Sequence, residues 1–314
     1  MPTLGIDLGG TFARAAVVDG VGTLLAAAKV PLVERSPAGV VETIAQAASD
    51  AVAAAGVPWK ACGVAAAGQI HKDSGVLSVA PNLGWRNVPL GALLTDRLGQ
   101  PVRVVNDLAA AAWGELHAGA GRGAQDMLVV FVGSGVGSAI IAGGLLVDGG
   151  GGVAGELGHI KVVPGGRRCG CGELGCLEAY AGGHNLIAQT RELLASGAPE
   201  VQRLTGGDPS RVTPVTLEQA AESGDSAAVE VYERAARFLA LAVANQVTML
   251  NPARLVLGGG VLTHCPGLRR RVEEGVREWS STTSREGLLI ADAELGDDSG
   301  LIGAALLVKD AAPH

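Results

Sequence analysis

A pattern of strand, glycine-rich turn and strand occurs once in each half of the 314-residue chain, and it constrains the fold more than any other feature. In the first half, apolar runs flank Gly9, Gly10 and Thr11. In the second half, apolar runs flank residues 133–137. Apolar strand-like runs alternate with helix-like segments along the rest of the chain, which is typical of parallel pairing in a doubly wound layout. The sequence therefore predicts a duplicated α/β architecture.

The individual elements follow from the same patterns. Strands are expected at residues 4–8, 13–18, 62–67, 102–105 and 254–257, and a strand, turn and strand at 127–147. Helices are expected at residues 40–55, 90–98, 107–116, 186–195, 217–223, 227–250 and 301–308. Residues 69–88 are expected to form a loop, 149–175 an irregular region, and 216–219 a capping box.

Charge and composition exclude several classes of partner. The 24 Lys and Arg residues against 31 Asp and Glu residues give a net charge of −7, which argues against a nucleic-acid backbone or an anionic membrane as partner. Aromatic residues make up only 3%, too few for a base-stacking platform. Residues 1–10 contain no secretory signal pattern, so we expect a cytoplasmic protein.

One apolar stretch leaves a membrane reading open. Residues 127–147 carry no charge and are long enough to cross a bilayer. However, glycines interrupt the stretch, and its flanks are Asp126 and Asp148 rather than basic residues. These features favour two strands around a tight turn.

The first glycine-rich turn is a candidate phosphate site. Glycines let the backbone approach an anion closely, and Asp7 just before them could hold a hydrated Mg²⁺. An ordinary hairpin turn explains the same residues, and taken alone it is the better explanation. The second turn, which contains Gly133, Ser134 and Gly135, favours phosphate binding because two such loops could enclose a polyphosphate.

Asn106 and Asp107 follow an expected strand and open an expected helix. A helix cap is their commonest role. The alternative role is ligand binding, because the two residues follow the end of a strand and open α/β sheets bind ligands at the carboxyl ends of strands. There Asp107 could accept the proton of an attacking hydroxyl.

The densest chemical signal is a cluster of three cysteines and a histidine. His159, Cys169, Cys171 and Cys176 are separated by short, glycine-rich segments. Three thiolates and one imidazole form a closed tetrahedral set that suits structural Zn²⁺. Buried free cysteines are the alternative, and an odd total of five cysteines in a chain without an export signal disfavours disulfides.

Polar residues near this cluster are candidate sugar contacts. Glu156 and Glu178 flank the cluster, and a folded metal loop would bring both carboxylates to one place, although exposed glutamates are common. Asn82 could bind the same ligand through its amide or serve only in a turn.

These residues resemble the ROK family of bacterial sugar kinases and repressors. The resemblance is carried by Asp7-Leu-Gly-Gly-Thr11, Asn106-Asp107, Gly155-Glu-Leu-Gly-His159 and the Cys169 to Glu178 segment, in order across the chain. It implies a two-domain actin-like fold (ribonuclease H-like, ASKHA) with an active-site cleft between the domains. We expect one domain at residues 1–118 plus 300–314, and a larger domain with the zinc loop at 119–299.

The resemblance also implies roles for single residues. It makes Asp107 the general base on the 6-hydroxyl of a sugar. It places around the sugar Asn106, Glu156, His159 and Glu178, to which we add Gly68 and Asn82 as candidate sugar contacts. It assigns phosphate and nucleotide binding to Gly9, Gly10, Thr11, Gly133, Ser134, Gly135, Gly258 and Gly259, and Asp7 is a further candidate at the first turn. It assigns zinc binding to His159, Cys169, Cys171 and Cys176.

The chain departs from the family pattern at a few positions. Phe12 stands where many relatives carry Lys or Asn, which leaves the phosphate contact of that side chain in doubt, and Arg14 need not replace it. Ser134 replaces a usual Thr but keeps the hydroxyl. Val105 stands where Glu is common, and Gly68-Gln69 lies in a loop that bears on the choice of sugar.

The sequence thus predicts a kinase that transfers the γ-phosphate of Mg-ATP to the 6-hydroxyl of glucose, with ATP, Mg²⁺ and structural Zn²⁺ as cofactors. Two alternatives stay open: a kinase of N-acetylated amino sugars (N-acetylmannosamine or N-acetylglucosamine), and a sugar-sensing regulator without a DNA-binding domain. A homodimer or homotetramer is expected by analogy with the family.

Overall fold

The computed structural model describes residues 1–309, and the chain forms two compact units. Among these residues, the first unit contains 1–125, 139–154 and 293–309, and the second contains 126–138 and 155–292. The predicted domain boundary after residue 118 stays a prediction. The first compact unit also includes residues 119–125, 139–154 and 293–299, which the prediction assigns to the larger domain. The predicted domain end at 310–314 lies outside the described residues.

The first unit is built on a five-stranded sheet in the order β3-β2-β1-β4-β8. Its strands are β1 (Thr3–Leu8), β2 (Phe12–Val18), β3 (Leu24–Pro31), β4 (Cys62–Ala66) and β8 (Val102–Asn106). β1 pairs in parallel with β4, and β4 with β8, whereas β2 is antiparallel to both β1 and β3. The sheet is therefore mixed, because the first glycine-rich turn joins neighbouring strands as a hairpin.

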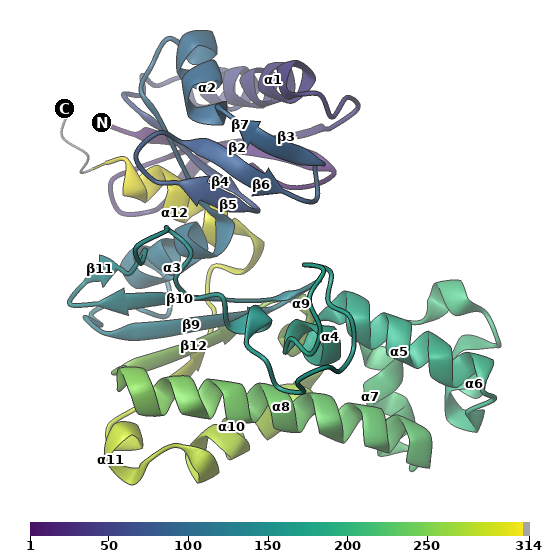
Figure 1. Cartoon of the computed structure of the whole chain (residues 1–314). Helices are drawn as coiled ribbons and strands as arrows, with labels where there is room; N and C mark the ends of the chain where they lie inside the picture. The colour runs from purple at the N-terminus through teal and green to yellow at the C-terminus, as the bar shows by residue number, and fades with distance from the viewer. Residues whose placement is uncertain (310–314) are drawn as a thin grey trace. The chain divides into compact units, whose positions relative to one another are not determined.

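Helices cover both faces of this sheet (Figure 1). On one face lie α1 (Pro37–Ala55) and α2 (Leu90–Leu98), and on the other α3 (Asp107–Ala118) and α12 (Ser299–Leu307). The alternation of side chains along β1 sends Leu4, Ile6 and Leu8 into a core with Val40 and Ile44 of α1. The helices at 40–55, 90–98, 107–116 and 301–308 predicted from the sequence are confirmed.

Residues 69–88 form a small sheet rather than the expected loop. β5 (Gln69–His71), β6 (Val76–Ala80) and β7 (Trp85–Val88) pair antiparallel in sequence order. Ile70, Leu77 and Trp85 point into the core of the first unit, and Trp85 donates its indole N–H to the Arg35 carbonyl at 2.8 Å. Burial of these side chains stabilises strands that are too short to stand alone.

The second five-stranded sheet has the order β11-β10-β9-β12-β13, and the division between the units passes through β10. Its strands are β9 (Met127–Val132), β10 (Val136–Ala142), β11 (Leu145–Leu146), β12 (Arg254–Gly258) and β13 (Leu289–Asp292). β12 is parallel to both β9 and β13. The stretch at 127–147 is strand, turn and strands as predicted, and within residues 1–309 no helix is both long and apolar enough to span a membrane.

The second unit carries most of the remaining helices. They are α4 (Glu178–Ala181), α5 (Gly183–Ala195), α6 (Pro199–Thr205), α7 (Pro214–Glu222), α8 (Ser226–Leu250), α9 (Gly260–His264), α10 (Pro266–Trp279) and α11 (Thr282–Arg285). The long helix α8 packs along α10, as Figure 1 shows. Single 3-10 turns occur at Leu157–His159 and Pro209–Arg211 here and at Gly296–Asp298 in the first unit.

Side-chain caps fix the ends of these helices. Asp225 accepts the N–H groups of Ala227 and Ala228 at the start of α8. The buried Glu218 of α7 accepts the N–H groups of Gly267 and Leu268 and thereby caps α10. The capping box predicted at 216–219 is misplaced: Thr213 is the N-cap of α7, because Pro214 suits the first helical position and Thr216 completes the box.

The closest packing in the first unit is between α12 and α3. A Cβ atom on Gly303 would lie 1.7 Å from the Ala110 carbonyl oxygen, so the two helices touch through their backbones. Gly114 of α3 approaches the Ser299 carbonyl in the same way, with a Cβ-to-oxygen distance of 2.4 Å. Only glycine fits this crossing.

We therefore expect Gly303→Ala to lower the free energy of unfolding by about 1–3 kcal/mol or more, the usual cost of overpacking. Gly300→Ala in the same helix is the matched control, because its Cβ would lie at an ordinary 3.8 Å from the Ala65 Cβ. Urea unfolding of both variants measures the difference. Equal midpoints for the two variants would contradict the packing account.

Candidate active site and metal cluster

The first glycine-rich turn connects β1 to β2 and carries Asp7 at its edge. Asp7 lies opposite Arg14 across the two strands, with 3.9 Å between Asp7 Oδ2 and Arg14 Nη1. Burial raises the pKa of the Asp7 carboxyl, and the Arg14 guanidinium partly opposes that shift. The negative charge of Asp7 is therefore costly here, and a nearby cation would stabilise it.

Arg14 is already engaged by acidic residues. It donates to the Asp297 carbonyl at 2.6 Å and pairs with the Asp298 carboxylate. The Lys29 ammonium lies 4.0 Å from the centre of the Phe12 ring, at the start of β2. The sequence analysis did not identify Lys29, because it did not predict β3, the strand that carries this residue.

Asn106 and Asp107 lie at the junction between β8 and α3. Asn106 Oδ1 accepts the N–H groups of Leu108 and Ala109 at 2.9 and 3.1 Å, so Asn106 is the helix cap. Its Nδ2 donates to the Gly68 carbonyl at 3.2 Å, which ties the loop after β4 to the same point. Asp107 Oδ1 accepts from Leu108 N at 2.9 Å, in the first turn of α3, where the helix dipole favours negative charge.

Asn82 offers an unpaired acceptor next to the first turn. Its Oδ1 is buried and has no hydrogen-bond partner among residues 1–309. A Cβ atom on Gly10 would lie 3.7 Å from the Asn82 Cβ, so the amide stands beside the glycine-rich turn. A buried polar atom without a partner is costly, and a ligand hydroxyl or a water would satisfy it.

The cysteines and the histidine of the predicted metal site come together in the second unit. The ligand atoms of His159, Cys169, Cys171 and Cys176 all lie within 4.8 Å of one another. The sulfur atoms of Cys171 and Cys176 are 3.8 Å apart, as are Cys169 Sγ and His159 Nδ1. A tetrahedral zinc with bonds of about 2.3 Å to sulfur needs ligand separations of about 3.8 Å, so this donor set fits the ion.

Lys161 lies beside this cluster and was missed by sequence reasoning. Its Nζ is 3.0 Å from Cys176 Sγ and also pairs with the Glu173 carboxylate. The hydrogen bonds to Cys176 and to Glu173 raise the pKa of Lys161. Three thiolates around Zn²⁺ leave one net negative charge, which this ammonium would offset.

Glu156 and Glu178 approach the cluster from different sides. Glu156 Oε2 is 3.7 Å from His159 Nε2, so His159 presents one ring nitrogen to the cluster and the other to a carboxylate. Glu178 Oε2 accepts the Val136 N–H at 3.0 Å, and its Oε1 is 3.6 Å from Cys169 Sγ. Glu178 therefore contacts both the cluster and the second glycine-rich turn.

The remaining predicted residues lie at turns of the second unit. Gly133, Ser134 and Gly135 join β9 to β10, and Gly258 and Gly259 join β12 to α9. Gly259 has φ +88°, and a Cβ on it would lie 2.5 Å from the Val132 carbonyl oxygen, so this turn packs tightly on β9.

The predicted site residues thus form two groups. The first unit brings together Asp7, Gly9, Gly10, Thr11, Gly68, Asn82, Asn106 and Asp107. The second holds Gly133, Ser134, Gly135, Glu156, His159, Cys169, Cys171, Cys176, Glu178, Gly258 and Gly259.

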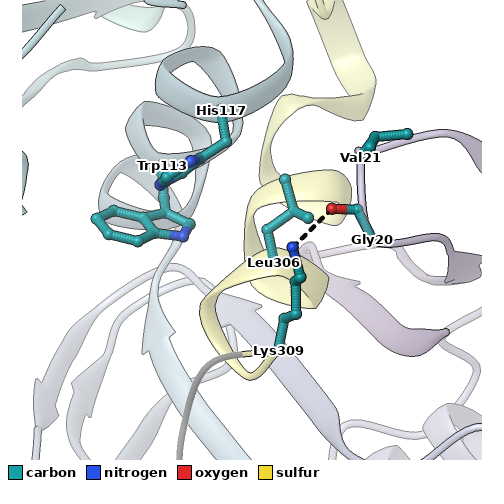
Figure 2. Close-up of a pocket in the computed structure, with 6 residues that line it drawn as sticks. All are labelled: Gly20, Val21, Trp113, His117, Leu306 and Lys309. Carbon is teal, nitrogen blue, oxygen red and sulfur yellow. Dashed lines mark hydrogen bonds between the residues drawn. The ribbon is translucent and has the colours of Figure 1, made fainter. Parts of the chain in front are cut away.

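The first unit also contains a pocket of about 170 Å³ (Figure 2). It is lined by Gly20, Val21, Trp113, His117, Leu306 and Lys309. Lys309 Nζ donates to the Gly20 carbonyl at 2.8 Å, and the Trp113 and His117 rings are 4.4 Å apart. None of the predicted site residues lines it.

Comparison with known proteins decides the family. The ROK family model matches residues 3–311. The chain belongs to the ROK family. A glucokinase of Streptomyces coelicolor is 35% identical over 99% of this chain and 98% of its own length, and an N-acetylmannosamine kinase of Escherichia coli is 33% identical over 98% and 99%.

Solved structures of ROK proteins share the fold. The crystal structure of a ROK family glucokinase from Streptomyces griseus in complex with glucose and AMPPNP superposes with a TM-score of 0.82, at 35% identity over 98% of this chain and 99% of that one. The ROK hexokinase from Thermus thermophilus gives a TM-score of 0.85, at 34% identity over 99% and 100%. The predicted two-domain actin-like α/β fold is confirmed.

We expect Cys171→Ser to release the metal, because the closed set then keeps only two thiolates and the imidazole. Cys62→Ala serves as the control, since Cys62 is buried in β4 outside the cluster. Elemental analysis of the purified proteins should find one zinc per chain in the control and much less in Cys171→Ser. Stoichiometric zinc in Cys171→Ser would remove this residue from the ligand set.

Proposed function

We propose that this ROK protein is an ATP-dependent glucokinase that phosphorylates the 6-hydroxyl of glucose. The observation that carries the proposal is the likeness over almost the whole chain to a glucokinase whose crystal structure holds glucose and AMPPNP. The chemistry of the predicted residues agrees with it: a carboxylate at a strand end, an unpaired amide oxygen and two glycine-rich turns. The proposed cofactors are ATP, Mg²⁺ brought with ATP, and structural Zn²⁺.

In the proposed reaction, Asp107 acts as the general base. The sugar 6-hydroxyl oxygen forms a bond to the γ-phosphorus, the bond from that phosphorus to the β,γ-bridging oxygen breaks, and ADP leaves. The hydroxyl proton passes to the Asp107 carboxylate. Asn106 holds the start of α3 and the Gly68 loop in place around this carboxylate.

The other predicted residues bind and orient the substrates. Asn82 would pair its buried Oδ1 with a sugar hydroxyl, and the Glu156 and Glu178 carboxylates would accept hydrogen bonds from other hydroxyls. The His159 ring nitrogen that faces away from the cluster would donate to a sugar hydroxyl. Gly9, Gly10, Thr11, Gly133, Ser134 and Gly135 would bind the phosphates, with Gly258 and Gly259 near the adenosine. Asp7 would hold the Mg²⁺ that accompanies ATP, which would neutralise phosphate charge.

The main alternative is a kinase of N-acetylated amino sugars, which the similarity to an N-acetylmannosamine kinase favours. A sugar-sensing regulator is the other alternative. We also propose that the protein is a cytoplasmic homodimer or homotetramer without nucleic-acid or membrane partners.

A coupled ADP-release assay with a panel of sugars separates these functions. We expect turnover with glucose to exceed turnover with mannose, fructose, N-acetylglucosamine and N-acetylmannosamine. A preference for an acetylated sugar would replace glucokinase by the first alternative. Absence of turnover with every sugar, combined with measurable sugar binding, would favour the regulator.

We expect Asp107→Asn to lower kcat by about 10²–10⁴, the usual contribution of a general base, while glucose still binds. The amide keeps an oxygen that accepts the Leu108 N–H, so the helix start is preserved. Asp208→Asn is the matched control, because Asp208 also accepts a backbone N–H, from Ser210, on an exposed 3-10 turn. Steady-state kinetics with near-normal kcat for Asp107→Asn would exclude the base role.

A further inference from the structure

We propose that the metal cluster fixes the position of the second glycine-rich turn, residues 133–137, so that metal loss weakens nucleotide binding as well as sugar binding. The inference rests on the proposed function, which assigns ATP phosphates to this turn. It goes further by coupling the cluster to the nucleotide, whereas the sequence places the cluster only beside the sugar.

The first contact runs through Glu178. This residue follows the metal-ligating Cys176 by two positions, and its Oε2 accepts the Val136 N–H at 3.0 Å. A carboxylate that accepts a backbone N–H forms a charge-assisted bond, which is stronger than a neutral one. The bond therefore ties the backbone beyond Cys176 to the end of the turn.

The second contact runs through Gly158, which directly precedes the ligand His159. A Cβ atom on Gly158 would lie 2.2 Å from the Val136 carbonyl oxygen and 3.2 Å from its carbon. The backbone next to His159 thus passes close to the carbonyl of Val136 and leaves no room for a side chain. Val136 is bound at its N–H by one neighbour of the cluster and closely approached at its C=O by another.

The chain beyond Glu178 continues along the same turn. Gly183 N donates to the Gly133 carbonyl at 3.0 Å, and His184 N donates to the Ser134 carbonyl at 2.9 Å. Within the turn, Gly133 N donates to the Gly135 carbonyl at 3.0 Å. Because the carbonyls are bound on the protein side, the segment after Cys176 orients a turn whose N–H groups are proposed to face phosphate.

The metal supplies order that this loop lacks. Between β11 and α4, regular structure among the described residues is limited to the 3-10 turn at Leu157–His159 and two isolated bridges, Lys161 to Cys176 and Arg168 to Leu174. A metal held by His159, Cys169, Cys171 and Cys176 would tie these irregular segments to one point.

Two glycine variants in the same loop test the coupling. Gly158→Ala adds a methyl group against Val136, whereas Gly170→Ala, between two ligands, meets nothing within 4 Å. Neither glycine has a positive φ, so the two variants differ in contact rather than in backbone strain. Both are expected to keep one zinc per chain, which elemental analysis verifies.

Two readouts are measured on the full chain. Hydrogen–deuterium exchange of the peptide containing residues 133–137, without nucleotide, should be faster in Gly158→Ala and unchanged in Gly170→Ala. The Kd for AMPPNP should rise roughly 10- to 100-fold in Gly158→Ala, because small misplacements of binding groups have effects of that size. Chelator treatment of the wild type should speed exchange at the same peptide, and added zinc should reverse it.

A second variant covers the case in which Gly158→Ala does not fold. Glu178→Ala removes the acceptor without adding bulk and should speed exchange of the Val136 amide roughly tenfold. Glu173→Ala, which removes an exposed carboxylate from the same loop, should leave this exchange unchanged.

Wild-type exchange at 133–137 in zinc-loaded Gly158→Ala and in Glu178→Ala would overturn the coupling. So would an AMPPNP Kd for folded, zinc-loaded Gly158→Ala that equals the Kd of Gly170→Ala. Failure of the part of the proposed function used here, ATP binding at this turn, looks different, because the wild type would then not bind AMPPNP at all. The exchange measurement needs no nucleotide, so it tests the coupling independently of the proposed function.

Discussion

Helix α12 lies against the first sheet at backbone distance, and the arrangement of the first unit depends on this contact. A Cβ on Gly5 would lie 2.1 Å from the Leu301 carbonyl oxygen, and a Cβ on Gly63 would lie 1.9 Å from that of Ala304. On its other side α12 meets α3 through Gly303. The C-terminal helix therefore positions the helix that begins at Asp107. This packing also explains a core rich in small residues and poor in aromatic ones.

Charged groups hold the segment that leads into α12. The fully buried Glu115 accepts N–H groups from Ala120, Glu294 and Leu295, and Arg14 binds Asp297 and Asp298. Arg14 also stands beside Asp7, whose half-buried carboxyl has a raised pKa because partial burial disfavours its charged form. Active sites commonly retain such unfavourable charges for function. In the proposed kinase, the cation that accompanies ATP would lessen the cost at Asp7.

Much of the fold could be predicted because its signals are local. The apolar runs at 4–8 and 254–257 and the helical pattern at 227–250 appear as expected, and the cysteine spacing predicted which side chains meet. β3 was not predicted, because the alanines at its centre lie on both faces of the strand and give little contrast between them. Helix α10 was not predicted either, although Leu268, Val272 and Val276 repeat every four residues among charged residues, a spacing typical of a helix.

The roles of single site residues are harder to predict, because they depend on contacts between distant positions. Glu178 and Val136 are 42 residues apart, and nothing near either residue in the sequence indicates their bond. Lys161 likewise acts on Cys176 through a pairing that only the folded loop creates. The residue types indicate which bonds and proton transfers the side chains can make, whereas the contacts that orient those side chains form only in the folded chain.

The loop that carries the Cys and His cluster has little apolar support, which is why we propose that an ion orders it. Its apolar support is small: Tyr180 packs edge-on against Phe238 of α8 at 5.3 Å, and the Tyr180 hydroxyl accepts the Arg167 N–H at 2.8 Å. Glycine loses more conformational entropy on folding than any other residue, so a glycine-rich loop is costly to order. Larger side chains would order it but would block the close approach at Gly158. In the proposed zinc-bound protein, the metal would order the loop from within and leave its surface free to touch the neighbouring turn.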